Sequence, residues 1–278
     1  MQKIVPLLLL LLPSLAAAAT PCQFSAPRNT DIDAAGLKSL SVTLGSADMD
    51  IRSVPGLTRI EVRGTACASD AAWLKDLQVT SDHVGEHASV QARNNHDGMN
   101  SGLFGSSYAY LKLQVRVPAS LAIGIGSGSG DVQAANLASL DFDSGSGDLV
   151  AADIAGMLTL KLGSADAKAS RVGSVDLRQT GSGDVGVDGV KGNVHAGRSG
   201  SGDLAFSNVG GSVDIGHTGS GDITLEHVGR DVKVGSTGSG DVDANGVGGN
   251  FTVAASGSGD IHHAGVKGTV SVPKSSDD

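Results

Sequence analysis

The sequence predicts an all-β protein, a parallel β-solenoid in which one chain winds into stacked coils. Gly-Ser-Gly-Asp occurs seven times, and one near-copy, Gly-Ser-Ala-Asp at 163–166, fills the gap in the series. Successive Asp residues of this series are 17 to 19 residues apart. Self-similarity at a short fixed period indicates one supersecondary unit stacked on copies of itself.

The hydrophobic pattern inside each repeat predicts two short strands. Counted from the Asp, apolar residues favour positions +1, +3, +10 and +12, and position +6 is Val in each of the last five repeats. Such alternation is typical of strands with one buried face, and Gly at +8 and in Gly-Ser-Gly-Asp marks the turns. Coils of this kind stack in parallel at about 4.8 Å. The period lacks the six-residue sub-repeats of left-handed solenoids, which favours a right-handed coil.

Composition agrees with this architecture and argues against others. Aromatic residues make up 3% of the chain, whereas 41 of its 278 residues are Gly. We therefore expect a thin core of stacked aliphatic side chains. The Gly density leaves no 3.6-residue helical period, and a propeller blade needs about twice this repeat length.

The N-terminal segment 1–19 predicts a secretory signal peptide. Lys3 supplies the positive n-region, 7–12 the apolar region, and 17–19 a small-residue cleavage site. We expect an exported protein, periplasmic or at the cell surface, with no integral membrane segment after cleavage. The remainder carries 19 basic and 29 acidic residues, and this negative charge disfavours nucleic acid as a partner.

Three further regions follow. Residues 20–120 form a β-rich region with a degenerate first coil at 36–63, in which Ile60 and Val62 supply the second strand. Its remainder, including a short helix near 69–75, caps the rod, because solenoid ends need cover. Residues 121–272 are the repeats, and 273–278 are a polar tail.

Cys22 and Cys67 are the two cysteines of the chain and predict one disulfide. Closing a loop of this length stabilises a fold by about 4 kcal/mol in the chain-entropy model. Neither residue has the sequence context of a catalytic or redox thiol.

The aspartates of the repeat are the main candidate site. Stacking them brings like charges together, so something must offset their repulsion. We expect each Asp to close its Gly-rich turn by accepting hydrogen bonds from nearby backbone N–H groups. The alternative is a Ca²⁺ ion bridging successive carboxylates. The column comprises Asp131, Asp148, Asp166, Asp184, Asp203, Asp222, Asp241 and Asp260.

Other candidate sites are weaker. His262 and His263 point to opposite faces of one strand, which disfavours a shared metal ion. The outward positions contain no paired carboxylates or Ser-His-Asp arrangement, so we predict no catalytic and no metal-binding residues. The Gly-, Ser- and Asn-rich loop 94–107 is the best non-repetitive candidate for a binding surface.

The repeats, with the stretch from Cys22 through 67–70 and 73–74, resemble the adhesin-like bacterial families of unknown function DUF4097 and DUF2807. The resemblance implies a β-solenoid and carries no catalytic residue. The leading hypothesis is an exported, non-enzymatic rod that binds an unknown envelope or surface ligand, or acts as a scaffold. The alternatives are a polysaccharide-active β-helix enzyme and a Ca²⁺-dependent structural module.

Overall fold

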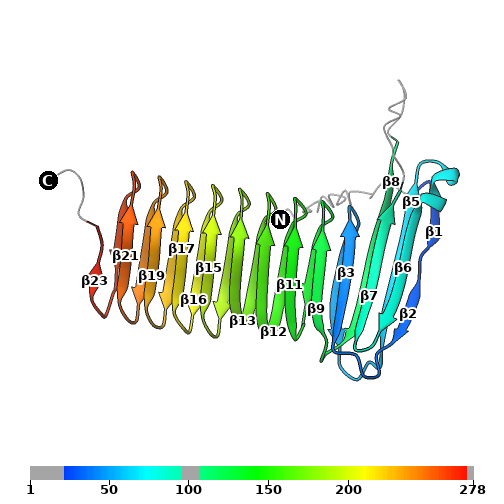
Figure 1. Ribbon diagram of the computed structural model, residues 1–278, viewed down its shortest axis with the longest axis horizontal. Helices are drawn as coiled ribbons and strands as arrows, with labels where there is room; N and C mark the ends of the chain where they lie inside the picture. The colour runs from blue at the N-terminus through cyan, green and yellow to red at the C-terminus, as the bar shows by residue number, and fades with distance from the viewer. Residues whose placement is uncertain (1–21, 96–106, 274–278) are drawn as a thin grey trace, which may run out of the picture.

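The structure is a computed structural model that describes residues 22–95 and 107–273. It is a flattened parallel β-solenoid with two facing sheets, elongated along the direction of coil stacking (Figure 1). The predicted signal segment 1–19 lies outside the described residues, as does all of the predicted tail except Pro273.

Each coil contributes one strand to each sheet. β12 (Leu149–Leu162) and β13 (Ala167–Thr180) bend around the edge and give one half to each sheet. From the N-terminal end of the rod, the other strands of sheet 1 are β1 (Phe24–Pro27) and β2 (Thr30–Asp33), β5 (Arg59–Ala68), β8 (Ala109–Pro118), β4 (Asp48–Val54), β10 (Val132–Ala135), β14 (Val185–Val190), β16 (Leu204–Val209), β18 (Ile223–Val228), β20 (Val242–Val247) and β22 (Ile261–Ala264). Those of sheet 2 are β6 (Leu77–Val84), β7 (His87–Asn94), β3 (Ser39–Gly45), β9 (Ala122–Ser127), β11 (Ser139–Ser144), β15 (Val194–Ser199), β17 (Val213–Thr218), β19 (Val232–Thr237), β21 (Phe251–Ser256) and β23 (Val270–Ser271).

The core lies between the sheets and consists of the predicted inward columns. At position +1, for example, Val185, Leu204, Ile223 and Val242 are each at most 1% exposed. Every strand pair from β9 and β10 onward is parallel, and all but β12–β13, which has two register shifts, keep one register, so inward side chains pack on their counterparts in the next coil. The alternating pattern of the sequence thus becomes continuous stacks of aliphatic side chains.

The N-terminal region adds an antiparallel end to the parallel rod. β3 and β4 form a coil that stacks on β9 and β10, and β7 and β8 stack in parallel on its other side. β5, which holds Ile60 and Val62, returns antiparallel to β8 in sheet 1, so it does not continue the coil as the sequence suggested. β6 runs antiparallel to β7 at the same end of sheet 2.

Local contacts fix this end of the rod. Cys22 and Cys67 form the disulfide, with their Cα atoms 5.7 Å apart, and attach the first residues to β5. The short helix is 3₁₀ and spans Ala71–Asp76 (η1); the Asp70 carboxylate caps it by accepting the Ala72 N–H at 2.8 Å. Arg28 donates to the carbonyls of Leu74 and Leu77 at 2.6 Å, which satisfies backbone groups at the C-terminal end of η1.

A column of buried hydroxyls stands four residues before the repeat aspartates. Most of these Ser and Thr side chains donate to the carbonyl of the residue before the Asp, at 2.6–3.0 Å. Where Ala replaces that Gly, in the two Gly-Ser-Ala-Asp corners, Leu44 and Leu162 replace the hydroxyl. Thr218 departs from the pattern, because its Oγ1 is fully buried and has no hydrogen-bond partner.

Two substitutions in this column should therefore have opposite effects. Thr180→Val removes the 2.9 Å hydrogen bond to the Gly183 carbonyl and should lower the free energy of unfolding by about 1 kcal/mol. Thr218→Val removes an unpaired buried hydroxyl and should leave that free energy unchanged or raise it by up to about 1 kcal/mol. Urea unfolding of both variants measures the difference. Equal losses of stability would show that the two hydroxyls do not differ in hydrogen bonding.

Candidate functional site

The eight repeat aspartates lie in one column along a corner of the rod, where sheet 2 passes into sheet 1. In the first seven, Oδ1 accepts a hydrogen bond from the backbone N–H of the Asp in the following coil, at 2.8–3.0 Å from Asp131–Asp148 to Asp241–Asp260. The N–H of the residue after each Asp donates to the carbonyl of the next Asp at 2.8–2.9 Å. Every coil is therefore held to its neighbour twice at this corner.

This geometry differs from the local turn closure expected from the sequence, because the hydrogen bonds run between coils. A negatively charged acceptor makes each one a charge-assisted bond, which offsets the repulsion between stacked carboxylates. One oxygen of each carboxylate is thereby occupied. Residues 22–95 and 107–273 contain no group of three or more His, Cys, Asp and Glu side chains placed to hold a metal ion.

A second column of this kind, which the sequence analysis missed, occupies the opposite corner before the strands of sheet 2. Asn193 Oδ1 accepts the N–H of Ser212, Asp231 accepts that of Asn250, and Asn250 accepts that of Thr269, at 2.8–2.9 Å. A Cβ on Gly211 would lie 2.2 Å from Asn193 Oδ1, which explains why Gly recurs at position +8. The signal in the sequence is the run of Asn, Ser, Asp and Thr at position +9.

The residue at position +5 of each repeat forms a third column, which the sequence pattern did not predict. It has a positive φ in every repeat. This left-handed conformation turns the chain near the end of the sheet 1 strand so that position +6 points inward. Asn, Asp and Gly adopt it readily, whereas Arg171 (φ 55°) and His227 (φ 54°) carry bulky side chains there. The column comprises Asn136, Asp153, Arg171, Gly189, Asn208, His227, Gly246 and Gly265.

A hollow on the rod interrupts this third column at Gly189. It is a surface groove of about 530 Å³, and it opens because Gly189 places no side chain between Arg171 and Asn208. Arg171 pairs with Asp153 through two 2.7 Å hydrogen bonds. Lys191 completes the charged part of the lining. We call this surface the Gly189 groove.

Charges in and beside the Gly189 groove are balanced and fixed. The hydrogen bonds from Arg171 hold the pKa of Asp153 below its usual value. Beside the groove, Ser207 and Asn208 each donate to Asp188 at 2.7 Å and lower its pKa. Both carboxylates therefore stay ionised at neutral pH, and neither has the raised pKa of a general acid.

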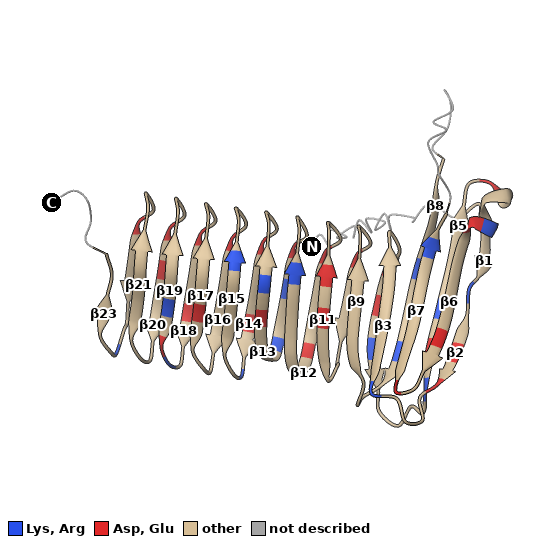
Figure 2. Cartoon of the chain, in the orientation of Figure 1, with Lys and Arg blue, Asp and Glu red and all other residues tan. Residues whose placement is uncertain are grey.

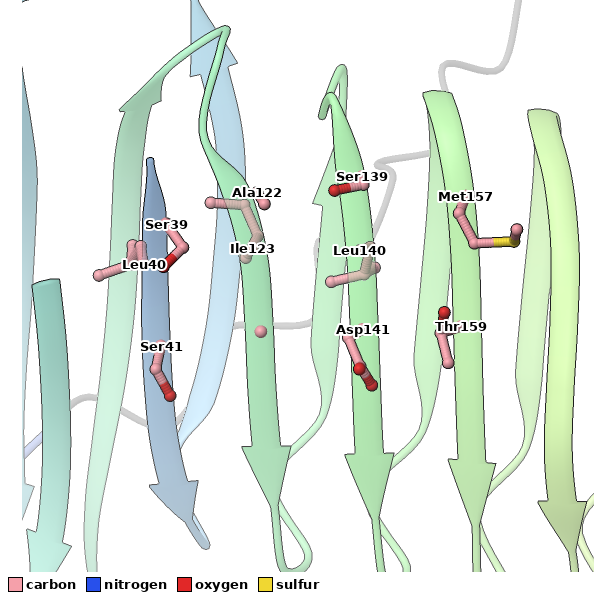
Figure 3. A pocket seen from close by; sticks show the side chains of 11 residues that line it. Ser39, Leu40, Ser41, Ala122, Ile123, Ser139, Leu140, Asp141, Met157 and Thr159 are labelled. Carbon is pink, nitrogen blue, oxygen red and sulfur yellow. The ribbon is translucent and has the colours of Figure 1, made fainter. Parts of the chain in front are cut away.

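A second, smaller groove of about 350 Å³ lies on the outer face of β3, β9, β11 and β12 (Figure 3). Small polar or apolar side chains line most of it, and Met157 is 44% exposed at its side. Its lining holds one ionisable group, Asp141, whose carboxylate lies 3.6 Å from the Arg178 guanidinium. The groove is therefore a concave surface with one ionisable side chain in its lining.

Apart from the Asp column, charges of both signs are spread over the described part of the rod. Figure 2 shows acidic and basic residues interspersed along the sheets. No helix within the described ranges is both long and apolar enough to span a bilayer.

Comparison with known proteins gives the family. The sequence profile of Toastrack DUF4097 matches residues 70–263. The chain belongs to this family. The match covers the helix η1 and all the repeats up to β22, so the corner columns lie inside the Toastrack domain.

A solved structure agrees in fold. A "putative lipid binding protein" from Parabacteroides distasonis ATCC 8503 is 14% identical, covers 88% of the Toastrack chain and 96% of its own, and has a TM-score of 0.50. A "putative adhesin" from Parabacteroides merdae ATCC 43184 is 12% identical, covers 90% and 96%, and has a TM-score of 0.45. At these identities the likeness concerns the fold alone. No curated protein matches the sequence.

The remaining sequence candidates do not form a site in the described Toastrack rod. His263 stacks against Phe251, with ring centroids 5.8 Å apart, at the last coil. Most of the predicted binding loop 94–107 lies outside the described residues, which resume at Ser107.

Removing one carboxylate from the Asp column should weaken the rod. Asp203→Ala deletes the acceptor of the 2.8 Å bond from the Asp222 N–H and should lower the free energy of unfolding by about 1 kcal/mol. Asp203→Asn keeps an Oδ1 acceptor and should lose less than half of that. Asp214→Ala is the control, since this exposed strand residue accepts no backbone hydrogen bond from the described residues through its side chain and lies 3.8 Å from His195. Equal effects of Asp203→Ala and Asp214→Ala would contradict a stabilising role for the column.

Proposed function

We propose that this protein is an exported, non-enzymatic rod that binds or scaffolds components of the bacterial cell envelope. The observation that carries the proposal is the fixed, repetitive architecture, in which corner side chains tie each coil to the next. A rod of this kind presents surface groups at a regular spacing of about 4.8 Å and does not need to move to do so.

The chemistry of the surface supports binding rather than catalysis. A hydrolytic enzyme acting on polysaccharides needs a carboxylic acid that can donate a proton near neutral pH. The carboxylates at the Gly189 groove have lowered pKa values instead. Fixed donors and acceptors with matched charges suit recognition of a polar, uncharged or zwitterionic ligand.

Two features support export. Residues 1–19 have the pattern of a signal peptide, and the Cys22–Cys67 disulfide suits an oxidising compartment. The solved relatives described as adhesins agree with an envelope location without carrying the argument.

We expect the purified protein to cosediment with an envelope fraction of its host, and Arg171→Gly to reduce the bound fraction. Arg171 is the cation beside the gap at Gly189, and Gly already occupies three positions of its column, so the fold should tolerate the change. His227→Gly is the matched control, because it removes the other bulky side chain of that column away from the groove.

The same preparation tests export. Fractionated cells should contain the protein outside the cytoplasm, with both cysteines resistant to alkylation until reduced. A cytoplasmic protein with free thiols, or an intact protein that binds no envelope fraction, would overturn the proposed function. Equal binding of the Arg171→Gly and His227→Gly variants would show that the Gly189 groove is not the binding site.

A further inference from the structure

The last described coil is open on its outer edge. β22 pairs only with β20, and β23 only with β21, among the residues that the structure describes. Both sheets therefore end in a row of unpaired backbone groups, at the end of the rod marked by β23 in Figure 1. Such an edge is a template for another strand.

The side chains of this end match a coil interior rather than a protein surface. Val270 and Val272 are 36% and 37% exposed, whereas Val232 and Val234 in the same columns of an inner coil are at most 1% exposed. Ile261 and Val266 are only partly buried. The end thus keeps the apolar columns at +1, +6, +10 and +12 that every other coil covers with its neighbour, whereas the +3 column ends in His263.

The corner column is also incomplete here. Asp241 accepts the N–H of Asp260 at 2.8 Å, but no described backbone N–H donates to the carboxylate of Asp260. The end coil therefore repeats the interface that joins coils within the chain, with its outer half missing.

The opposite end of the rod cannot supply that half. There the outermost described strands are β1 and β2 in sheet 1, which pair only with β5, and β6 in sheet 2, which pairs only with β7; all are antiparallel, and most of their side chains are exposed. Head-to-tail stacking of copies would place the apolar last coil against these antiparallel strands with mostly exposed side chains, where no coil of the repeat type is present. A contact between two identical open ends has no such obstacle and closes after two copies.

We propose that the open edge of β22 and β23 is a dimerisation surface that pairs with the same edge of a second copy. The two-fold axis reverses strand direction, so β22 meets its counterpart antiparallel and continues sheet 1 across the interface. The two Asp260 side chains then lie at opposite corners. Each faces the bend that holds Lys267 of the other copy, which adds charge complementarity to the apolar contact.

Sedimentation velocity and small-angle scattering on the protein, produced with its own leader, test this. We expect a particle of twice the chain mass and nearly twice the rod length. Val270→Lys places a charge on the paired edge and should abolish the dimer. Val150→Lys is the matched control, because Val150 is 55% exposed on an outer sheet face and should stay dimeric as a lysine.

Circular dichroism checks that the variants fold, and Val272→Lys replaces Val270→Lys if the latter does not. A monomeric wild-type protein would overturn the proposal and would mean that other residues or another protein cover the end. A dimer that survives both edge variants, or one lost in Val150→Lys, would place the contact elsewhere. Growing polymers would contradict the closed symmetric contact.

Discussion

The structure depends on hydrogen bonds that pass between coils at the corners. A single coil has no neighbour within itself to pair its backbone, so every strand and every turn must bond to the coil above or below. The strands do this through the sheet ladders. At the corners backbone bonds between coils continue, as from the Ser201 N–H to the Gly181 carbonyl, and the Asp column and the Asn193–Asp231–Asn250 column add side-chain oxygens to them. Both corners are thereby tied along the rod.

The need for hydrogen bonds between coils explains the recurrence of Asp, Asn and Gly better than packing in the core does. The acceptor at each corner must be short, so Asp and Asn recur. The chain that passes over it must leave room, so Gly recurs one coil later, as Gly211 does above Asn193. The Gly189 groove also arises from a Gly. One residue of the left-handed column has no side chain, and this leaves a gap beside Arg171. A binding surface can thus arise from a change that costs the fold little.

The sequence predicted what repeats and failed where the repeat stops. The period, the inward columns and the corner position of the aspartates all follow from spacing alone, because each coil meets the same constraint. Whether Asp203 bonds within its own turn or to Asp222 does not follow from spacing, since both satisfy one N–H group. The path of β5 was also missed: Ile60 and Val62 alternate like any strand, and only tertiary pairing decides that they run antiparallel to β8. The Gly189 groove depends on one absent side chain, which a pattern average hides.

Amide hydrogen exchange at the Asp222 N–H tests the central claim most directly, because this group donates to Asp203 Oδ1 in the coil before it. We expect the Asp222 amide to be protected in the wild-type protein and to exchange about fivefold faster in Asp203→Ala, the ratio that a loss of about 1 kcal/mol implies. The Ile223 amide, which donates to the Asp241 carbonyl, should keep its protection. An Asp222 amide that exchanges freely in the wild type, or at the same rate in both proteins, would show that the Asp column does not stabilise the contact between coils.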